Sequence, residues 1–553
     1  MLSYRKLAMR VLGRPLHTGG GIDSPRPASQ RAAAFILTAA MLTTLTAPAF
    51  AKTWDIADGD ITVKAGEAEG PNKVKQGDSD FVKDEGDTII TGTSDKNTVT
   101  IEAENEGDKV EVTLKDVNID ASRGSEAAVS VTGKGDTNIE LDGDNELQGG
   151  NRHAGLEHNQ TVDSKGNVTS GKLTIQDDND NAGSLTATGG YFGAGIGGGS
   201  AKAGQVTITG GTITAISGDG AGIGGGQGNM GSNAGNADIE ISGGTIEATG
   251  GYTSAGIGGG SFGDGTIIIK DNAMIGTAAG GNYGAGIGGG ALGVGDVTIE
   301  GNVTIKDARG GSNAAGIGGG YGAKNDKDGN GNQITIKSNE SGAPTVNATG
   351  GVSDVDSDTG ETIPGGAGIG SGLGDAKADI TLEGKVTIVA KAGEGNAAIG
   401  DMNGEQVFTG LDGSITRYDS EGNDTTLPTD PGYPVPADTS SSGGGSADAS
   451  VQESIFPGLV VTDKDGQRIS YTSIRGNNVL SIRVGRFTAS LRASLATLRQ
   501  LRAEGIDTIT FQTILRSTTL SVDELLAMGG EDAEVVLTHH IRSSTLTVGG
   551  KAV

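Results

Sequence analysis

Three segments of the chain concentrate carboxylates at spacings that could bind a cation. They read "QDDNDN" from residue 176, "KNDKDGNGN" from residue 324 and "SDVDSDTGE" from residue 353. Carboxylates at alternate positions can converge on one ion when a loop curls, and calcium takes roughly six to eight such oxygens. Solvated acidic loops that hold no ion are the alternative. The predicted metal ligands are Asp177, Asp178, Asp180, Asp354, Asp356 and Asp358.

Tyrosines recur just ahead of a repeated hexapeptide, "AGIGGG". Tyr191, Tyr252 and Tyr283 lie two or three residues before its alanine, whereas the copies at Ala221 and Ala315 have no aromatic residue there. An aromatic ring offers an apolar face against which a sugar ring can pack. We predict that the three tyrosines bind a ligand, with packing at a turn as the alternative.

Side chains that commonly catalyse reactions are sparse. The chain has no cysteine and five histidines, so thiol chemistry, disulfides and thiolate metal sites are excluded. A polysaccharide lyase would need calcium carboxylates beside an arginine or lysine base. Arg123, Arg152, Arg309 and Arg417 lie apart in sequence from the acidic segments. We therefore predict a protein that is not an enzyme and has no catalytic residues, with a lyase as an alternative.

The hexapeptide marks an internal repeat. It begins at Ala194, Ala221, Ala255, Ala285 and Ala315, and variants follow at residues 367 and 397. Between copies lie runs such as "QVTITGGTITA", in which apolar and polar residues alternate as they do along a strand. About three short strands fit one repeat, which is too short for a helical crossover. This pattern predicts one coil of a parallel β-solenoid per repeat.

The repeated isoleucine should face the inside of such a solenoid. Stacked coils align equivalent residues, so Ile196, Ile223, Ile257, Ile287, Ile317 and Ile369 would form one internal column. The glycines that follow would form the corner, meaning the turn between two strands of a coil, where successive backbones approach closely. The alternative is a flat, side-chain-free strip against which a ligand lies.

The ends of the chain differ from the repeats. Basic residues precede the apolar run "AAAFILTAAMLTTLTAPAFA", which ends in the small-residue pattern of a cleavage site, so residues 1–51 are predicted to be a signal peptide. Residues 52–422 form the repeat domain, with first coils and a cap containing Trp54 at 52–150 and glycine-repeat coils at 151–422. A Pro/Ser/Gly linker is predicted at 423–454.

Residues 455–553 are predicted to form a small α/β domain. Leu491, Leu495, Leu498 and Leu501 share one face of a predicted helix, and Ser521 with Glu524 has the spacing of a helix start. His539 and His540 at a strand end are expected to comprise one buried and one exposed ring. Attachment, assembly and capping are alternative roles of this domain.

Charge narrows the class of partner. Residues 1–51 carry +5 and residues 455–553 carry +2, so residues 52–454 carry −35 of the total of −28. An acidic body lacks the basic stripe that nucleic acid requires, which excludes nucleic-acid binding. No second apolar span follows the signal, so we expect an extracellular protein, secreted or associated with a cell surface, without a membrane span after cleavage.

The order of motifs carries a resemblance over residues 53–410. "TWDIADGDITV", "NIELDGDNELQGG", "HAGLEHN" and serial "GAGIGGG" resemble the secreted bacterial carbohydrate-binding-domain proteins, a parallel β-helix family that includes a clostridial cellulose- and pectate-binding adhesin. The resemblance implies a right-handed parallel β-helix, calcium sites and attachment to polysaccharide without cleavage. We expect a polysaccharide-binding adhesin with calcium as its candidate cofactor, whose ligand is a plant cell-wall or host glycan. The alternative is a structural stalk that displays the C-terminal domain.

Overall fold

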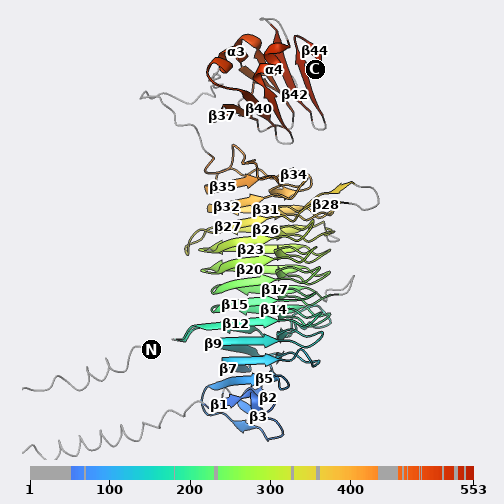
Figure 1. The fold of residues 1–553 in the computed structure, drawn as a ribbon. Coiled ribbons are helices and arrows are strands. Elements are labelled where there is room, and N and C mark those ends of the chain that lie inside the picture. Colours follow the sequence, from blue (N-terminus) through green and yellow to red (C-terminus); the bar gives the residue numbers. More distant parts are fainter. Residues whose placement is uncertain are drawn as a thin grey trace, which may run out of the picture. The chain divides into compact units, whose positions relative to one another are not determined.

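The structure is a computed structural model of the 553-residue chain. It describes residues 52–67, 70–179, 181–228, 235–325, 329–355, 361–433, 459–463, 466–469, 471–476, 478–484, 486, 488–513, 516–528, 533–540 and 543–552. The predicted signal peptide and most of the predicted linker lie outside these residues. Figure 1 shows stacked strands from β1 to β35 as one elongated body.

That body is a parallel β-helix, as the sequence predicts. Each glycine-repeat coil contributes two strands to a 19-stranded sheet and one two- or three-residue strand to a 14-stranded sheet. Each coil in turn contributes to the larger sheet the strands β11 (Leu173–Gln176) and β12 (Gly183–Thr188), β14 (Gly204–Ile208) and β15 (Thr212–Ile216), β17 (Ala237–Ile241) and β18 (Thr245–Thr249), β20 (Gly265–Asp271) and β21 (Met274–Ala279), β23 (Gly295–Gly301) and β24 (Thr304–Arg309), β26 (Asn332–Lys337) and β27 (Thr345–Thr349), and β31 (Ala378–Glu383) and β32 (Lys385–Lys391). The last strand, β35 (Asp412–Tyr418), follows them.

The isoleucine column is confirmed. Ile257 pairs with Ile287, which pairs with Ile317, and the column runs through every copy of the hexapeptide with no solvent exposure. Leu156 and Ile399 extend it in both directions. Between residues 151 and 422, the strands of this smaller sheet are β10 (Leu156–His158), β13 (Ile196–Gly197), β16 (Ile223–Gly224), β19 (Ile257–Gly258), β22 (Ile287–Gly288), β25 (Ile317–Gly318), β30 (Ile369–Gly370), β33 (Ile399–Asp401) and β34 (Gly404–Glu405), and five earlier strands complete it.

The glycine after each isoleucine has no room for a side chain. Gly288 has φ +139°, and a Cβ atom there would lie 1.9 Å from the carbonyl oxygen of Gly318 in the next coil. Glycine is therefore required both by the backbone conformation and by the contact between coils. The corner is a consequence of close stacking, as the packing interpretation predicts.

The amino-terminal coils close the first end of the β-helix. Trp54 is 4% exposed, and its indole nitrogen donates to the buried carboxylate of Asp84 at 2.8 Å. An antiparallel turn of chain, β2 to β4, covers the end of the smaller sheet. The strands are β1 (Thr53–Asp55), β2 (Ile61–Lys64), β3 (Lys73–Gln76), β4 (Val82–Lys83), β5 (Thr88–Ser94), β6 (Val99–Ala103), β7 (Lys109–Asp120), β8 (Val129–Gly133) and β9 (Asp136–Gln148), and η1 (Ile56–Asp58) is a short 3-10 helix.

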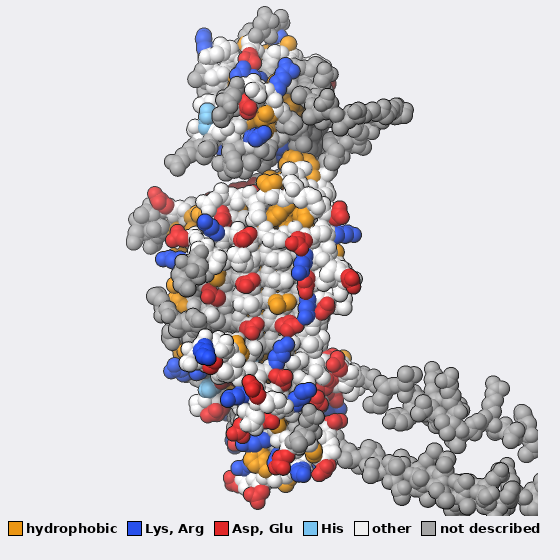
Figure 2. Space-filling view, turned by 180° about the vertical axis from the view of Figure 1, so that it is seen from behind, with side chains coloured by type: hydrophobic (Ala, Val, Ile, Leu, Met, Phe, Trp, Pro, Cys, Tyr) orange, Lys and Arg blue, Asp and Glu red, His pale blue; other side chains and the backbone are white. Residues whose placement is uncertain are grey.

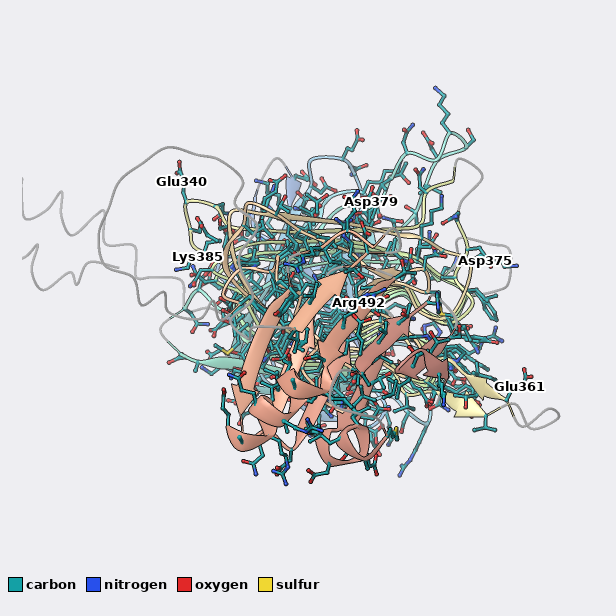
Figure 3. The ribbon with its side chains drawn as sticks, turned by 90° about the horizontal axis from the view of Figure 1, so that it is seen from above. Glu340, Glu361, Asp375, Asp379, Lys385 and Arg492 are labelled. Atoms are coloured by element: carbon teal, nitrogen blue, oxygen red, sulfur yellow. The ribbon has the colours of Figure 1, made fainter. Side chains whose placement is uncertain are left out.

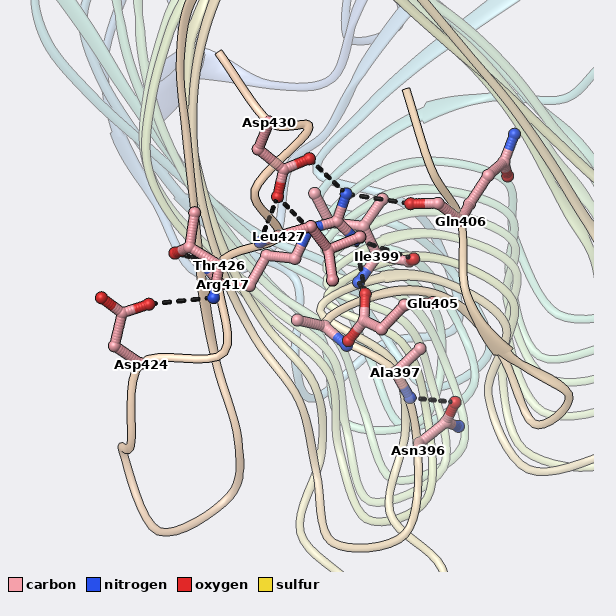
Figure 4. Close-up of polar contacts among 11 residues, drawn as sticks. Asn396, Ala397, Ile399, Glu405, Gln406, Arg417, Asp424, Thr426, Leu427 and Asp430 are labelled. Atoms are coloured by element: carbon pink, nitrogen blue, oxygen red, sulfur yellow. Dashed lines mark hydrogen bonds and ion pairs between the residues drawn. The ribbon is translucent and has the colours of Figure 1, made fainter. Parts of the chain in front are cut away.

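A buried arginine closes the opposite end (Figure 4). Arg417 is fully buried, and its guanidinium donates to both oxygens of Asp430 at 2.7 and 2.9 Å and to Glu405. The segment that carries Asp430 folds back along β35, where Ile415 N donates to Pro431 O. Residues 423–433 thus pack on the last coil, so the folded body extends beyond the predicted boundary at 422.

The C-terminal domain, taken by itself, has two sheets and two helices among its described residues. The five-stranded sheet contains β36 (Leu459–Thr462), β39 (Ala489–Ser494), β42 (Glu534–His539), β43 (Ser544–Val548) and β44 (Lys551–Ala552). The four-stranded sheet contains β37 (Thr472–Gly476), β38 (Val479–Arg483), β40 (Thr508–Gln512) and β41 (Ser517–Ser521). The helices are α3 (Leu495–Ala503) and α4 (Val522–Ala527).

The predicted first helix of this domain starts later than expected. Leu491 lies on β39, because Ala489, Leu491 and Ala493 alternate into the core, and α3 begins only after Ser494. The Ser494 hydroxyl accepts from Thr497 N and so caps the helix. Ser521 caps α4 as predicted, and His539 is buried whereas His540 is exposed.

Gly288→Ala should destabilise the β-helix severely. The methyl group would meet the Gly318 carbonyl as well as adopt an unfavourable φ, so we expect a loss of more than about 4 kcal/mol in the free energy of unfolding. Gly404→Ala is the matched control, since Gly404 has φ +133° but no atom within 4 Å of a Cβ. Chemical denaturation compares them, and equal losses would contradict a steric clash between coils.

Asp430→Asn should loosen the C-terminal end of the β-helix. It removes the charge that compensates the buried Arg417 guanidinium, and breaking such a pair costs about 3–5 kcal/mol. We expect a lower unfolding midpoint and faster amide exchange at Ile415 and Ile399. Asp424→Asn, on the same segment but exposed, is the control; unchanged exchange in Asp430→Asn would refute the closing role.

His539 should make the C-terminal domain less stable in acid. Burial, followed by the charges of Arg516 and His540, lowers the pKa of His539 to about 4, and its ring nitrogens contact the hydroxyls of Thr513 and Thr518. An unfolded histidine titrates near pH ~6.5, so the unfolded chain takes up the proton first and stability falls between pH ~6.5 and ~4. His539→Gln should flatten this part of the stability profile, and His540→Gln should leave it unchanged.

Candidate functional site

The corners before and after each hexapeptide lie side by side on one edge of the β-helix. The hexapeptide folds back on itself, because Ala285 N donates to Gly289 O at 2.9 Å. Ala291, just after the glycines, then donates to Thr253 O in the preceding coil at 2.8 Å. Residues on both sides of a hexapeptide therefore share one surface.

Three tyrosines from successive coils meet on this surface, and we name Tyr252, Tyr283 and Tyr321 the aromatic strip. The ring centroids of Tyr252 and Tyr283 are 5.9 Å apart, and those of Tyr283 and Tyr321 are 5.0 Å apart. Tyr252 is 56% exposed and Tyr321 37%. The structure thus brings together two of the three predicted tyrosines and adds a third that the sequence analysis missed.

Tyr321 was missed because it follows its hexapeptide instead of preceding it. Its backbone N–H nevertheless donates to Tyr283 O at 2.9 Å, so it continues the column of the preceding tyrosines. The glycine run could have indicated this position. A glycine-rich segment that reverses direction brings the residues before and after it next to each other, and Tyr321 comes directly after such a segment.

Two apolar residues beside the strip hold an unfavourable backbone conformation. Phe262 and Leu292 have φ +62° and +65°, and each follows its hexapeptide alanine by seven residues. The next coil has Gly322 at this position, with φ +72°. Leu292 is nonetheless 39% exposed, and its N–H donates to Tyr321 O at 2.7 Å. Left-handed backbone costs a side-chain-bearing residue about 1–2 kcal/mol, so the chain retains two apolar side chains, one of them exposed, where glycine would be less strained.

A depression of 540 Å³ continues the strip past Tyr321. Leu373 and Met402 supply apolar atoms, and Asp375, Asp401 and Asn403 supply polar ones. Figure 3 shows Asp375 on the side of the β-helix away from Glu340. The lining thus mixes apolar side chains with polar groups that could orient a ligand carrying hydroxyls.

Tyr283 can donate a hydrogen bond at neutral pH. Burial first, and then the neighbouring Tyr252 and the carboxylate of Asp354, raise the pKa of the Tyr283 phenol above its usual value of 10.0. The hydroxyl therefore keeps its proton. The strip combines apolar ring surface with hydroxyl groups, which suits a ligand that has both apolar faces and hydroxyls.

Comparison with known proteins supports the architecture. A family model described as "Beta helix repeat" matches residues 181–200, 206–227 and 239–261, three stretches that coincide with successive coils. Neither the curated proteins nor the solved structures gave a match. The chain is thus similar to parallel β-helix repeat proteins over these coils.

Tyr191 lies apart from the strip. It is 63% exposed, and its ring packs edge-on against Phe192 with centroids 4.6 Å apart. Gly218 separates it from Tyr252: a Cβ on Gly218 would lie 3.4 Å from Tyr191 O, and Tyr252 N donates to Gly218 O. Tyr191 therefore occupies the same column two coils away, with a coil between them that has no side chain in this column.

The predicted calcium ligands are only partly described. Asp177 and Asp178 lie on the loop from β11 to β12, where Asp178 N and Asn179 N donate to the Glu140 carboxylate. Asp354 lies exposed on β28 (Asp354–Val355), which pairs with β29 (Thr362–Ile363) in a projecting hairpin (Figure 1). Asp180, Asp356 and Asp358 lie outside the described residues. No metal-binding group of three occurs within the part of the chain that the structure describes, and calcium stays a prediction.

The coil before Ala194, which reads "AGLEHN" from Ala154, has a buried carboxylate where the hexapeptide has glycine. Glu157 pairs in register with Gly197, and its oxygens accept from Ala154 N, His153 Nδ1 and Asn159 Nδ2. Gly199 in the next coil leaves room for it, since a Cβ there would lie 2.7 Å from Glu157 Oε2. This network fixes the corner at residues 152–159.

The outer face of the larger sheet carries opposite charges in register. Lys270, Glu300, Lys337 and Glu383 follow one another up four coils, and Lys337 pairs with Glu300 at 3.0 Å. Figure 2 shows acidic and basic side chains alternating up one face of the body. These charges satisfy one another across the sheet. Among the described residues, no helix has the length and apolar character needed to cross a membrane.

Proposed function

We propose that this protein is an extracellular, non-catalytic β-helix that binds an uncharged stretch of polysaccharide along the aromatic strip. The observation that carries the proposal is Leu292, an exposed apolar side chain kept in left-handed backbone beside Tyr321. Strained residues persist where function selects them. Phe262, one coil earlier, is half-buried and has the same left-handed backbone.

The spacing of the coils supports a sugar chain as the ligand. Coils stack at about 4.8 Å, and one pyranose unit advances an extended chain by a similar length. A chain that runs along the stack can therefore place one sugar ring against each ring of the strip. Ring faces pack against the tyrosines and Leu292, while sugar hydroxyls reach the phenol groups and the polar lining at Asp375 and Asn403.

Charge favours an uncharged stretch at this place. The body is strongly acidic, and Asp375 and Asp401 line the depression next to the strip. A run of carboxylates on the ligand would be repelled there unless a cation bridged the two. Calcium is the cation proposed for such bridging. Binding measured with and without a chelator tests this.

Leu292→Gly should separate function from stability. The full chain from residue 52, with this change, should bind insoluble cellulose, mannan or xylan more weakly than the parent while its thermal midpoint stays level or rises. Tyr283→Ala should reduce binding by about tenfold or more, because it removes the central ring contact of the strip. Depletion isotherms on each polysaccharide, with and without chelator, give the affinities.

Ile268→Thr is the matched control, since Ile268 is 39% exposed on the outer face of β20, away from the corners. It should bind like the parent. Parental binding by both Leu292→Gly and Tyr283→Ala would overturn the site, and no binding to any glycan would favour a structural stalk. Release of unsaturated sugar ends would instead establish a lyase.

A further inference from the structure

Arg152 is an unpaired cation on an acidic body. Of the four arginines between residues 52 and 433, Arg123 pairs with Asp95, Arg309 with Asp307, and Arg417 with Glu405 and Asp430. Arg152 is exposed and makes no ion pair with any residue in the described part of the chain. Its charge is available to a ligand.

The backbone at Arg152 is strained. Its φ is +77°, in the left-handed region that favours glycine and asparagine. The equivalent position before Ala315, two residues ahead of the alanine, is Asn313, with φ +61°. The later coil thus has asparagine, which adopts this conformation readily, whereas the earlier coil has an arginine at the same position.

Arg152 lies beside two aromatic rings, the half-buried Phe192 and the exposed Tyr191. Its guanidinium carbon is 5.9 Å from the centroid of the Phe192 ring, which packs edge-on against Tyr191. A guanidinium held against a ring keeps its N–H donors free at the edge, in a planar fork that matches a carboxylate or a sulfate. Tyr191, at 63% exposure, offers a ring face next to it.

A depression of 460 Å³ adjoins these rings. Ser122, Gln148 and Asn151 supply a hydroxyl and two amides to its lining, together with Tyr191 and Phe192. The carboxylate of Glu157, five residues beyond Arg152, is turned inward and accepts from His153, Ala154 and Asn159. It is therefore not free to pair with the arginine.

We infer that Arg152, Tyr191 and Phe192, here named the arginine corner, bind a sugar residue that carries an oxyanion, either a carboxylate or a sulfate ester. The guanidinium binds the oxyanion, Tyr191 packs against the sugar ring, and the amides of Gln148 and Asn151 bind its hydroxyls. The corner lies in the same column as Tyr252, about two coils or ~10 Å away. One glycan can reach both places, so the inference extends the proposed function, although the anion site stands on its own residues.

Titration calorimetry of the full chain from residue 52 tests the arginine corner. The probes are galacturonate oligomers, sulfated galactan oligomers and uncharged galactan oligomers of equal length, each in chelator to exclude cation bridging. We expect one anionic series to bind at least about tenfold more tightly than the uncharged one and to weaken as salt rises. The series that binds distinguishes a carboxylate from a sulfate.

Arg152→Asn and Arg152→Gly make the test independent of folding. Both residues accept the left-handed backbone, so the thermal midpoint should stay level or rise while the preference for the anionic probe disappears. Tyr191→Ala should weaken binding of the same probe, and Arg309→Gln, an exposed arginine on a distant coil, should leave it unchanged. An anionic preference that survives in Arg152→Asn, or that is absent from the parent protein, would overturn the inference.

Tyr283→Ala distinguishes the two proposals. If the arginine corner is correct and the strip is not, short anionic probes bind this variant and the parent equally, and uncharged polysaccharide binds neither. If the strip alone is correct, uncharged polysaccharide binding is lost in Tyr283→Ala and unaffected in Arg152→Asn, with no anionic preference in either protein.

Discussion

The hydrogen-bonded contact between successive coils is the constraint on which the molecule depends. Its strictest point is the corner, where Gly258 and Gly288 lie so close to the carbonyl of the next coil that a Cβ atom would overlap it, at 2.0 and 1.9 Å. The coils can stack only because the side chain is missing there. The same contact aligns Ile257 with Ile287 inside and the tyrosines with one another outside. Core and surface thus inherit a single register.

The repeated hexapeptide and strand pattern allow the fold to be predicted from the sequence. They also explain which features could not be predicted. Strand alternation, the isoleucine column and the glycine corners follow from local pattern, because each depends on neighbours one coil away and the coils share the hexapeptide and the strand pattern. Tyr321 and Leu292 were missed because their position depends on the hexapeptide turning back on itself. The alternation of apolar and polar residues along the strands does not indicate such a turn. Leu292 has left-handed backbone, and Tyr321 follows its hexapeptide instead of preceding it. Both features gain meaning only when the structure shows that the corners before and after a hexapeptide lie side by side.

Irregular segments account for the remaining differences. Leu491 continues the leucine spacing of α3, yet it belongs to β39 because Ser494 terminates the strand and caps the helix. Residues 423–433 read as a linker, but Asp430 is required by a buried cation at position 417, a partner that composition cannot indicate. The first acidic segment shows the converse case: it is clustered in sequence, but the contact described there is made by its backbone, because Asp178 N and Asn179 N donate to the Glu140 carboxylate.

The closed ends have a consequence for how such a chain can change over time. The stack ends in two contacts that no coil repeats, Trp54 with Asp84 and Arg417 with Asp430. The coils between them share the hexapeptide and the strand pattern. Insertion or deletion of the gene segment that encodes one such coil would lengthen or shorten the stack by a coil while both ends stay intact. The reach of the surface along the axis would then vary in single-coil steps, and a lineage could adjust the length of ligand it engages without redesigning the fold.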